Sequence, residues 1–132
     1  PYTPYKNDLS VRVSEVPGFL ADVDRYVGDS YPEFEVCWYG HIGDGNLHLN
    51  ILRPEDMTVE EFFKHGHGMS PKIFEIVAAR RGSISAEHGV GLLKRDFLGY
   101  TRSDDEIALM HGLKALFDPH QILNPNKLLA TP

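Results

Sequence analysis

A histidine lies on each side of an Asp-Gly dipeptide in the segment GHIGDGNLHLN, residues 40–50. Asp-Gly between alternating apolar residues is a strong signal for a two-residue hairpin turn of type I′. If Asp44 and Gly45 form that turn, His41 pairs directly with His48. Opposed residues of an antiparallel pair have Cβ atoms roughly 4.5–5.5 Å apart. The spacing therefore predicts two imidazoles that could share one metal ion.

The alternation of residue types assigns the two faces of this predicted hairpin, which covers about residues 34–52. Successive side chains of a strand point to opposite faces. One face is apolar and is expected to meet the core: Val36, Trp38, Ile42, Leu47, Leu49 and Ile51. The other face carries the polar groups: Cys37, Tyr39, His41, His48 and Asn50. A single histidine on a wet face is commonly solvated and idle, but two in cross-strand register, with Asn50 beside them, favour a binding site.

A second segment with chemical potential is SISAEHGVGLLK, residues 83–94, in which Glu87-His88 follows a short apolar run. Gly89 and Gly91 allow a ligand to approach the backbone closely. If Glu87 meets the hairpin histidines, the set becomes two imidazoles and one carboxylate with open positions, which suits Zn²⁺, Mn²⁺, Fe²⁺ or Co²⁺. Alternatively, Glu87 caps a helix and His88 is a surface residue. The other histidines are expected to be solvated: His65, His67, His111 and His120.

The order of predicted elements is typical of a known small fold. A strand over 8–13, a helix ending near Gly28, the hairpin, a helical stretch over 58–82 and a short strand over 83–85 follow one another. This order predicts an α+β, ferredoxin-like split βαβ antiparallel sheet with helices on one face.

Three details of the helices follow from single residues. Thr58 and Glu61 form a capping box for the helical stretch over 58–82. Gly66, Gly68 and Pro71 are expected to break that stretch in two. Beyond the sheet, a C-terminal helix begins with the pair Ser103/Glu106 and ends at Asp118-Pro119, and an irregular arm follows.

Composition narrows the class of protein. The chain has 132 residues, 42% of them hydrophobic, as expected for one globular domain. A formal net charge of −6 without a Lys/Arg cluster argues against nucleic acid or an anionic membrane as partner. Neither a membrane span nor a secretory signal is found, and the single cysteine suits a reducing compartment, so we expect a cytoplasmic or organelle-matrix protein. The first residue is proline, which suggests a fragment of a longer chain.

Other catalytic motifs are missing from the sequence. It contains no G-x-S-x-G elbow, P-loop or G-x-G-x-x-G fingerprint. Cys37 has no electropositive neighbours and is expected to serve packing.

Three segments carry a resemblance to a known family: GHIGDGNLHLN, SAEHGVGLLKRDFLGY and LKALFDPHQILNPNK. In order and spacing they resemble the C-terminal domain of FAD-linked oxidases, a family that includes glycolate oxidase subunits, D-lactate dehydrogenases and D-2-hydroxyglutarate dehydrogenases. The likeness covers nearly the whole chain. It implies that residues 1–132 are one substrate or cap domain, that the flavin-binding domain is absent from this chain, and that the chain alone is neither yellow nor active.

The resemblance also implies roles for particular residues. His41, His48 and Glu87 would bind a divalent metal, zinc or manganese, and Lys6 and Asn50 would bind the substrate. His88 would take the hydroxyl proton and contact the substrate. A cofactor contact is implied for Asn124, near the FAD. The partners implied are the FAD-binding domain of the same polypeptide and a small 2-hydroxy acid, and a homodimer is allowed.

The activity implied is oxidation of a D-2-hydroxy acid to a 2-oxo acid, with hydride transfer to FAD. Two functions of other classes use the same residues. In a metal-dependent hydrolase, the ligands would activate water. In a non-catalytic binding module, the fold would serve recognition alone.

Overall fold

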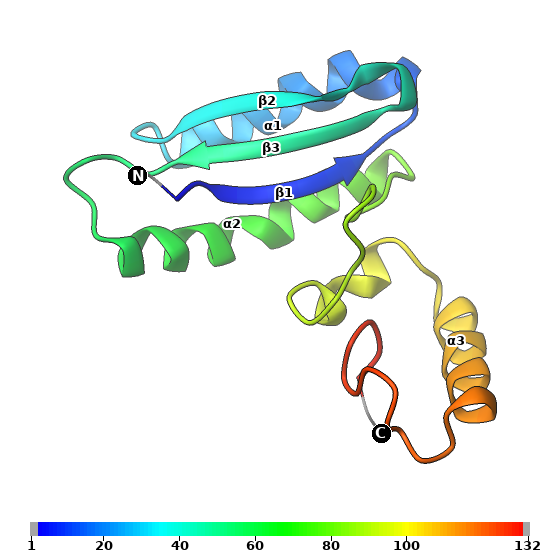
Figure 1. Cartoon of the computed structure of the whole chain (residues 1–132). Coiled ribbons are helices and arrows are strands. Elements are labelled where there is room, and N and C mark those ends of the chain that lie inside the picture. The colour runs from blue at the N-terminus through cyan, green and yellow to red at the C-terminus, as the bar shows by residue number, and fades with distance from the viewer. Residues whose placement is uncertain (1–2, 131–132) are drawn as a thin grey trace.

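The computed structural model describes residues 3–130. Three strands and two helices form the N-terminal part, and their bounds are β1 Tyr5–Ser10, α1 Val16–Ser30, β2 Glu35–His41, β3 Asn46–Leu52 and α2 Val59–Ala79 (Figure 1). A C-terminal helix, α3, covers Asp104–Phe117. Short 3₁₀ turns connect them: η1 Val13–Glu15, η2 Ile42–Asp44 and η3 Arg95–Tyr100.

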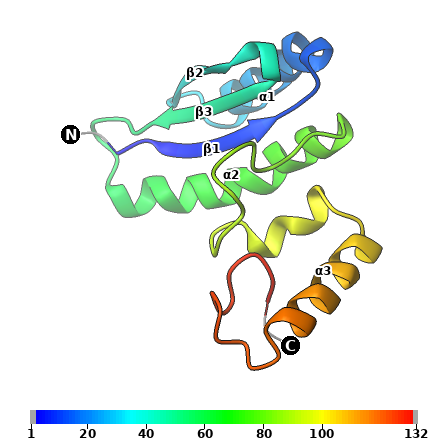
Figure 2. The same cartoon turned by 45° about the vertical axis from the view of Figure 1, so that its right-hand side comes forward.

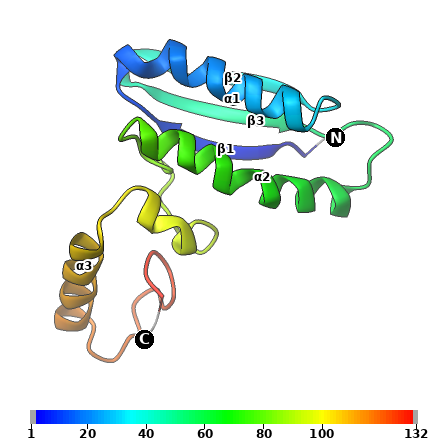
Figure 3. The ribbon, with the colours of Figure 1, turned by 180° about the vertical axis from the view of Figure 1, so that it is seen from behind.

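The sheet has the order β1-β3-β2, and both neighbouring pairs are antiparallel. β1 and β2, connected through α1, therefore lie on either side of β3, which is the split βαβ arrangement predicted. Seen from behind, α1 and α2 both cover the same face of the sheet (Figure 3). The opposite face carries no helix of the N-terminal part. The predicted α+β class is confirmed.

The core lies between this sheet and the two helices. Each element buries the residues at its own period, every second residue in the strands and every third or fourth in the helices. Phe19 of α1 and Phe74 of α2 are among the largest side chains it contains. The core residues from the strands and these helices are Leu9, Val16, Phe19, Val23, Val27, Leu47, Leu49, Ile51, Phe62, Met69, Ile73, Phe74 and Val77.

The register of the β2–β3 hairpin differs from the prediction. His41 pairs with Asn46, and His48 pairs with Tyr39, so the two histidines are not directly opposed. The connection is four residues long because only Gly45 is left-handed, with φ +68°, whereas Asp44 ends the 3₁₀ turn η2. A type I′ turn needs positive φ at both central residues. The shift is two residues, so the predicted polar and apolar faces are kept within both strands. Ile42, predicted to meet the core, lies instead in η2 and is 64% exposed.

Packing against a distant residue accounts for this longer loop. The amide N–H of Val11 donates to the carbonyl of Gly45 at 3.1 Å. A Cβ on Gly45 would lie 1.9 Å from the carbonyl oxygen of Val11. The loop tip is thereby held against the chain that leaves β1, and only glycine fits there.

α2 is a single continuous helix, so the predicted break near Gly66 and Pro71 is wrong. The capping box of Thr58 and Glu61 is present as predicted. The apolar stripe of α2 continues past Pro71 and is buried on the sheet, and this burial outweighs the missing backbone N–H of one proline.

The predicted fourth strand over 83–85 is reduced to one bridge, between Ser83 and Ser10 beside β1. The backbone groups that a longer β-ladder would pair form hydrogen bonds with side chains instead. The N–H of Ile84 donates to Oγ1 of Thr101, and Nζ of Lys94 donates to the carbonyl of Ile84. The edge of β1 therefore borders a loop segment, visible in yellow-green in Figure 2.

α3 begins in the predicted capping box of Ser103 and Glu106 and ends before Asp118. It lies apart from the sheet, together with the chain that follows it (Figures 1 and 3). All of its residues are described, and none is buried. Its exposed apolar side chains include Leu109, Leu116 and Phe117, at 70%, 73% and 77%. None of the helices formed by residues 3–130 combines the length and hydropathy needed to traverse a lipid bilayer.

Candidate active site

The helix-free face of the sheet carries polar side chains from its two neighbouring strands β1 and β3. Lys6 pairs with Asn50, Asp8 with His48, and Ser10 with Asn46. Directly paired residues point to the same face, so these side chains form two adjacent rows. Asp8, His48 and Asn46 are nevertheless buried, because the segment after α2 crosses over them.

Asp8 attaches that segment to the sheet. Its Oδ2 accepts the backbone N–H groups of Glu87 and His88, both at 2.9 Å. Lys94 adds a second attachment, since its Nζ donates to the carbonyls of Asp8, at 3.1 Å, and of Ile84. Two residues far along the chain, Glu87 and His88, are thus held at the edge of β1.

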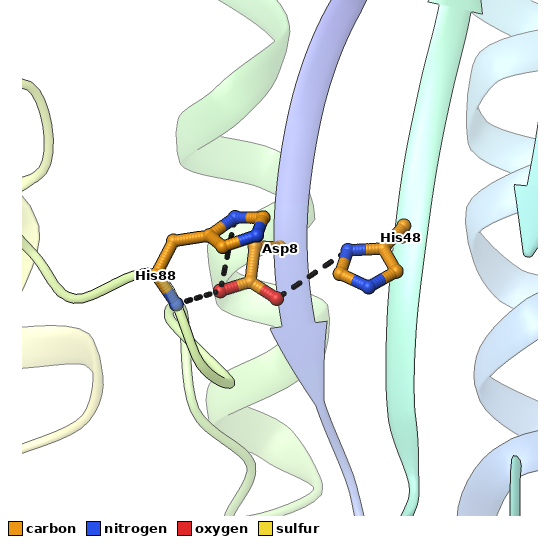
Figure 4. Close-up of side chains that lie close together, drawn as sticks. All are labelled: Asp8, His48 and His88. Carbon is orange, nitrogen blue, oxygen red and sulfur yellow. Dashed lines mark hydrogen bonds and ion pairs between the residues drawn. The ribbon is translucent and has the colours of Figure 1, made fainter. Parts of the chain in front are cut away.

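The titratable side chains converge above β1 and β3. Nε2 of His48 is 3.3 Å from Oε1 of Glu87, and Nδ1 of His48 is 3.5 Å from Oδ1 of Asp8. His88 is more exposed. Its Nδ1 is 3.6 Å from Oδ2 of Asp8, and its ring stacks on that of His48 with centroids 5.4 Å apart. Figure 4 shows Asp8 between the two imidazoles.

Charge and burial shift two pKa values in this cluster. Burial raises the pKa of Asp8, but the backbone hydrogen bonds from His88 and Glu87, with the charges of His88 and Lys94, outweigh it and lower that pKa overall. Burial lowers the pKa of the Lys94 ammonium, and the charge of Asp8 partly offsets this. Asp8 is therefore an anion at neutral pH.

A pocket of about 310 Å³ opens beside this cluster. Its floor is formed by the strand residues Lys6, Asp8, His48 and Asn50, and its walls by Tyr39 and the chain from His88 to Lys94. The pocket combines two ammonium groups, two amides, two imidazoles and a carboxylate with the apolar side chains of Val90, Leu92 and Leu93. A volume at the small end of the usual range for ligand sites suits a small anionic molecule.

Several of the residues predicted to have a function from the sequence meet in this region. Lys6, Asn50, His48 and His88 line the pocket, and Glu87 contacts His48. Oε2 of Glu87 also accepts a hydrogen bond from Nδ2 of Asn46 at 3.0 Å. The structure thus brings these predicted residues together, and their individual roles stay predictions.

His41 and Asn124 are not brought into the pocket. His41 is exposed and lies opposite Asn46, two pairs beyond the Tyr39–His48 pair. Asn124 lies in the arm after α3, with a left-handed backbone, φ +46°. A separate cavity of about 360 Å³ between α3 and that arm contains Lys114 and Asp118, which pair with each other.

Sequence reasoning missed Asp8, Tyr39 and Lys94 as members of the site. A signal for Asp8 was present, because its carboxylate lies in the middle of a strand and on the same face as Lys6, two residues away. The ring of Tyr39 covers that of His48, with centroids 4.9 Å apart. Lys94 gave no signal, since its partners are backbone carbonyls that depend on the tertiary fold.

The donor set suits a divalent cation. Among residues 3–130, one group of three His, Cys, Asp or Glu residues has ligand atoms all within 4.8 Å of one another, namely Asp8, His48 and His88. The pair His48 Nε2 and Glu87 Oε1 is closer still. Buried side-chain oxygens of Asp8, Asn46 and Asn50 on this face have no hydrogen-bond partner. Such unsatisfied oxygens indicate a place for a cation or a hydrogen-bonding ligand.

Comparison with known proteins identifies relatives of this chain. The chain is 56% identical over 129 residues to a D-2-hydroxyglutarate dehydrogenase of Stutzerimonas stutzeri and 50% identical over 130 residues to one of Xanthomonas citri pv. viticola. Each match covers 98% of this chain and 28% of the relative. A mitochondrial D-2-hydroxyglutarate dehydrogenase of Bos taurus is 44% identical over 128 residues, which are 96% of this chain and 22% of that protein. The chain thus spans less than a third of these relatives.

Residues 2–128 match the family described as FAD linked oxidases, C-terminal domain. The match runs through both strands of the polar face, the segment with Glu87 and His88, and α3. This chain belongs to that family of FAD-linked oxidase C-terminal domains.

Proposed function

We propose that this chain is the substrate-binding and metal-binding part of an FAD-dependent D-2-hydroxy-acid dehydrogenase, with D-2-hydroxyglutarate as the substrate. The observation that carries the proposal is the convergence of Lys6, Asn50, His48 and His88 on one pocket, with Glu87 at 3.3 Å from His48. The names of the relatives supply the substrate.

The pocket residues suit a 2-hydroxy carboxylate. The ammonium of Lys6 and the amide of Asn50, adjacent across β1 and β3, would hold the carboxylate or the hydroxyl. His88, which is exposed to the pocket, would take the hydroxyl proton as general base. Asp8 and Glu87, each 3.6 Å from a nitrogen of His88, would stabilise the imidazolium that forms.

Two groups absent from the chain complete the chemistry. FAD held by the rest of the polypeptide would supply the acceptor for the hydride that leaves Cα, so that the 2-hydroxy acid would become a 2-oxo acid. A divalent ion, Zn²⁺ or Mn²⁺, would be held by His48 and Glu87, with His41 as the third predicted ligand, and would favour ionisation of the hydroxyl. The close approach of Nε2 and Oε1 and the unpartnered oxygens nearby support this fit.

Two substitutions in the longer polypeptide that carries the FAD-binding part test the roles. Glu87→Gln removes the anionic ligand, so metal content by mass spectrometry and the rate of flavin reduction should both fall. His88→Asn should leave the metal content unchanged and slow flavin reduction on the order of 10²–10⁴-fold, as loss of a general base does. His120→Asn, a change after α3, is the control and should alter neither quantity.

The opposite pattern would contradict the assignment. If His88→Asn strips the metal while Glu87→Gln retains it, the two roles are exchanged. If neither change slows flavin reduction, the reaction takes place elsewhere. Hydrolysis by the metal-loaded chain without flavin would instead favour the hydrolase.

A further inference from the structure

Asp8 is the one acidic side chain of the cluster that sequence motifs did not single out. Its carboxylate is buried and hydrogen-bonded to the segment that carries Glu87 and His88. Only 5% of the residue is exposed. Oδ2 accepts two backbone N–H groups at 2.9 Å, from Glu87 and His88. These two bonds come from consecutive amides of the same segment, so they fix the plane of the carboxylate.

The other oxygen of Asp8 faces His48. Oδ1 is buried and has no hydrogen-bond partner, and Nδ1 of His48 is 3.5 Å away. A neutral imidazole carries one N–H, and an acceptor beside one ring nitrogen favours the tautomer that has the proton there. Nε2 also faces a carboxylate, that of Glu87, but the Glu87 side chain is 47% exposed and water can solvate it, whereas Oδ1 of Asp8 is buried and has no other donor. The anionic Oδ1 therefore favours the Nδ1–H form of His48, which leaves Nε2 as an unprotonated acceptor.

The other ring nitrogen of His48, Nε2, faces Glu87. Nε2 is 3.3 Å from Oε1 of Glu87. In the Nδ1–H tautomer both of these atoms are acceptors, and two acceptors at this distance require a cation or a proton between them. Metal-binding histidines almost always donate their other ring N–H to a carboxylate or carbonyl, which fixes the ring.

We propose that Asp8 is a positioning residue that holds His48 in its Nδ1–H tautomer and directs Nε2 toward Glu87. This inference builds on the proposed function, since it states which face of His48 meets the metal. It also decides between the two possible donor sets. Asp8 lies behind His48 and is not a ligand, so the set of Asp8, His48 and His88 does not bind the ion.

The tautomer can be measured directly in the metal-free 132-residue chain. The ring ¹⁵N shifts and long-range ¹H–¹⁵N couplings of His48, assigned by comparison with His48→Gln, should show the proton on Nδ1 at about pH 8, above the ordinary pKa of imidazole. A proton on Nε2 would overturn the proposal. So would a Zn²⁺ titration in which the metal shift appears on Nδ1.

Asp8→Asn adds a sharper test because it keeps the shape of the side chain. The amide oxygen would take over the two backbone N–H groups, so the NH₂ group would face His48 and force the proton to Nε2. We expect the tautomer to switch and the affinity for Zn²⁺ to fall on the order of 10–100-fold, as for other carboxylates behind a metal-binding histidine. An unchanged tautomer and affinity would refute the role of Asp8.

A matched control is available in Asp118. Its carboxylate is also buried and accepts two backbone N–H groups, from Ile122 and Leu123, at 2.9 and 3.0 Å. Asp118→Asn should therefore perturb a buried carboxylate outside the site while leaving the His48 tautomer and the Zn²⁺ affinity unchanged. Equal losses of Zn²⁺ affinity in both variants would mean that the effect of Asp8→Asn does not act through His48. Absence of Zn²⁺ binding in the unchanged chain would count against the proposed metal site, whereas the tautomer would still decide the role of Asp8.

Discussion

Gly66 of α2 faces β1 so closely that a methyl group should destabilise the fold there. A Cβ at this position would lie 2.5 Å from Cδ2 and 2.7 Å from Cε2 of Tyr5, whose ring is hydrogen-bonded through its hydroxyl to Ser70 at 2.8 Å. In an open helix, glycine to alanine stabilises by about 1 kcal/mol. Overpacking of a filled site costs about 1–3 kcal/mol. Gly66→Ala should therefore lower the free energy of unfolding by about 0–2 kcal/mol.

Gly68, two residues further along the same helix, supplies the control. A Cβ there meets no atom within 4 Å among the described residues. Gly68→Ala should accordingly raise the free energy of unfolding by up to about 1 kcal/mol. Urea unfolding followed by far-UV circular dichroism measures both variants. If Gly66→Ala stabilises the chain as much as Gly68→Ala does, Tyr5 does not occupy the space above α2, and the described seating of β1 on this helix is wrong.

Two further predictions concern Lys94 and the helix caps. Lys94→Met leaves the carbonyls of Asp8 and Ile84 without their donor and should lower the free energy of unfolding by about 1–3 kcal/mol in urea titrations. The pKa of Lys94 is lowered in the folded chain, so between that pKa and the ordinary value of 10.5 the unfolded chain binds more protons than the folded chain. The stability of the unchanged chain should therefore rise with pH in this interval, and that of the variant should not. Thr58→Ala should lower the free energy of unfolding by about 1 kcal/mol and with it the urea midpoint, whereas Ser103→Ala should only speed hydrogen exchange within α3, which buries none of its described residues. Equal shifts of the midpoint in the two cap variants would show that α3 unfolds with the sheet.

The sequence predicted those features that depend on local periodicity. The alternation in 36–51 assigned the polar and apolar faces of the hairpin, and the capping boxes at Thr58 and Ser103 marked the starts of two helices. A two-residue shift of register leaves the faces of the strands unchanged, so these were predicted correctly, although the pairing of His41 with His48 and the place of Ile42 in the core were not. The shift depends on the contact of Gly45 with Val11, which no local pattern reveals.

Features that depend on tertiary contacts were missed or predicted wrongly. Pro71 is tolerated because α2 is buried along its length, and a local rule for proline does not include that burial. Asp8 meets Glu87 and His88 across 79 and 80 residues of chain. The sequence therefore indicated the residues of the candidate site in two separate segments, and the fold supplied the carboxylate that connects them.

The distance along the chain between Asp8 and its partners bears on how the molecule folds and opens. The β2–β3 hairpin closes a short loop, whereas the Lys94 contact with the Asp8 carbonyl closes one of 86 residues. Contacts of such long range form late, and the attached segment buries little beyond Ile84. Detachment of this segment is therefore the local opening of the N-terminal part that requires the least free energy. This opening would disassemble the pocket while the sheet stays folded. An ion or substrate bound both to the sheet and to the attached segment would oppose that opening, so occupancy of the pocket would set how long the site stays assembled.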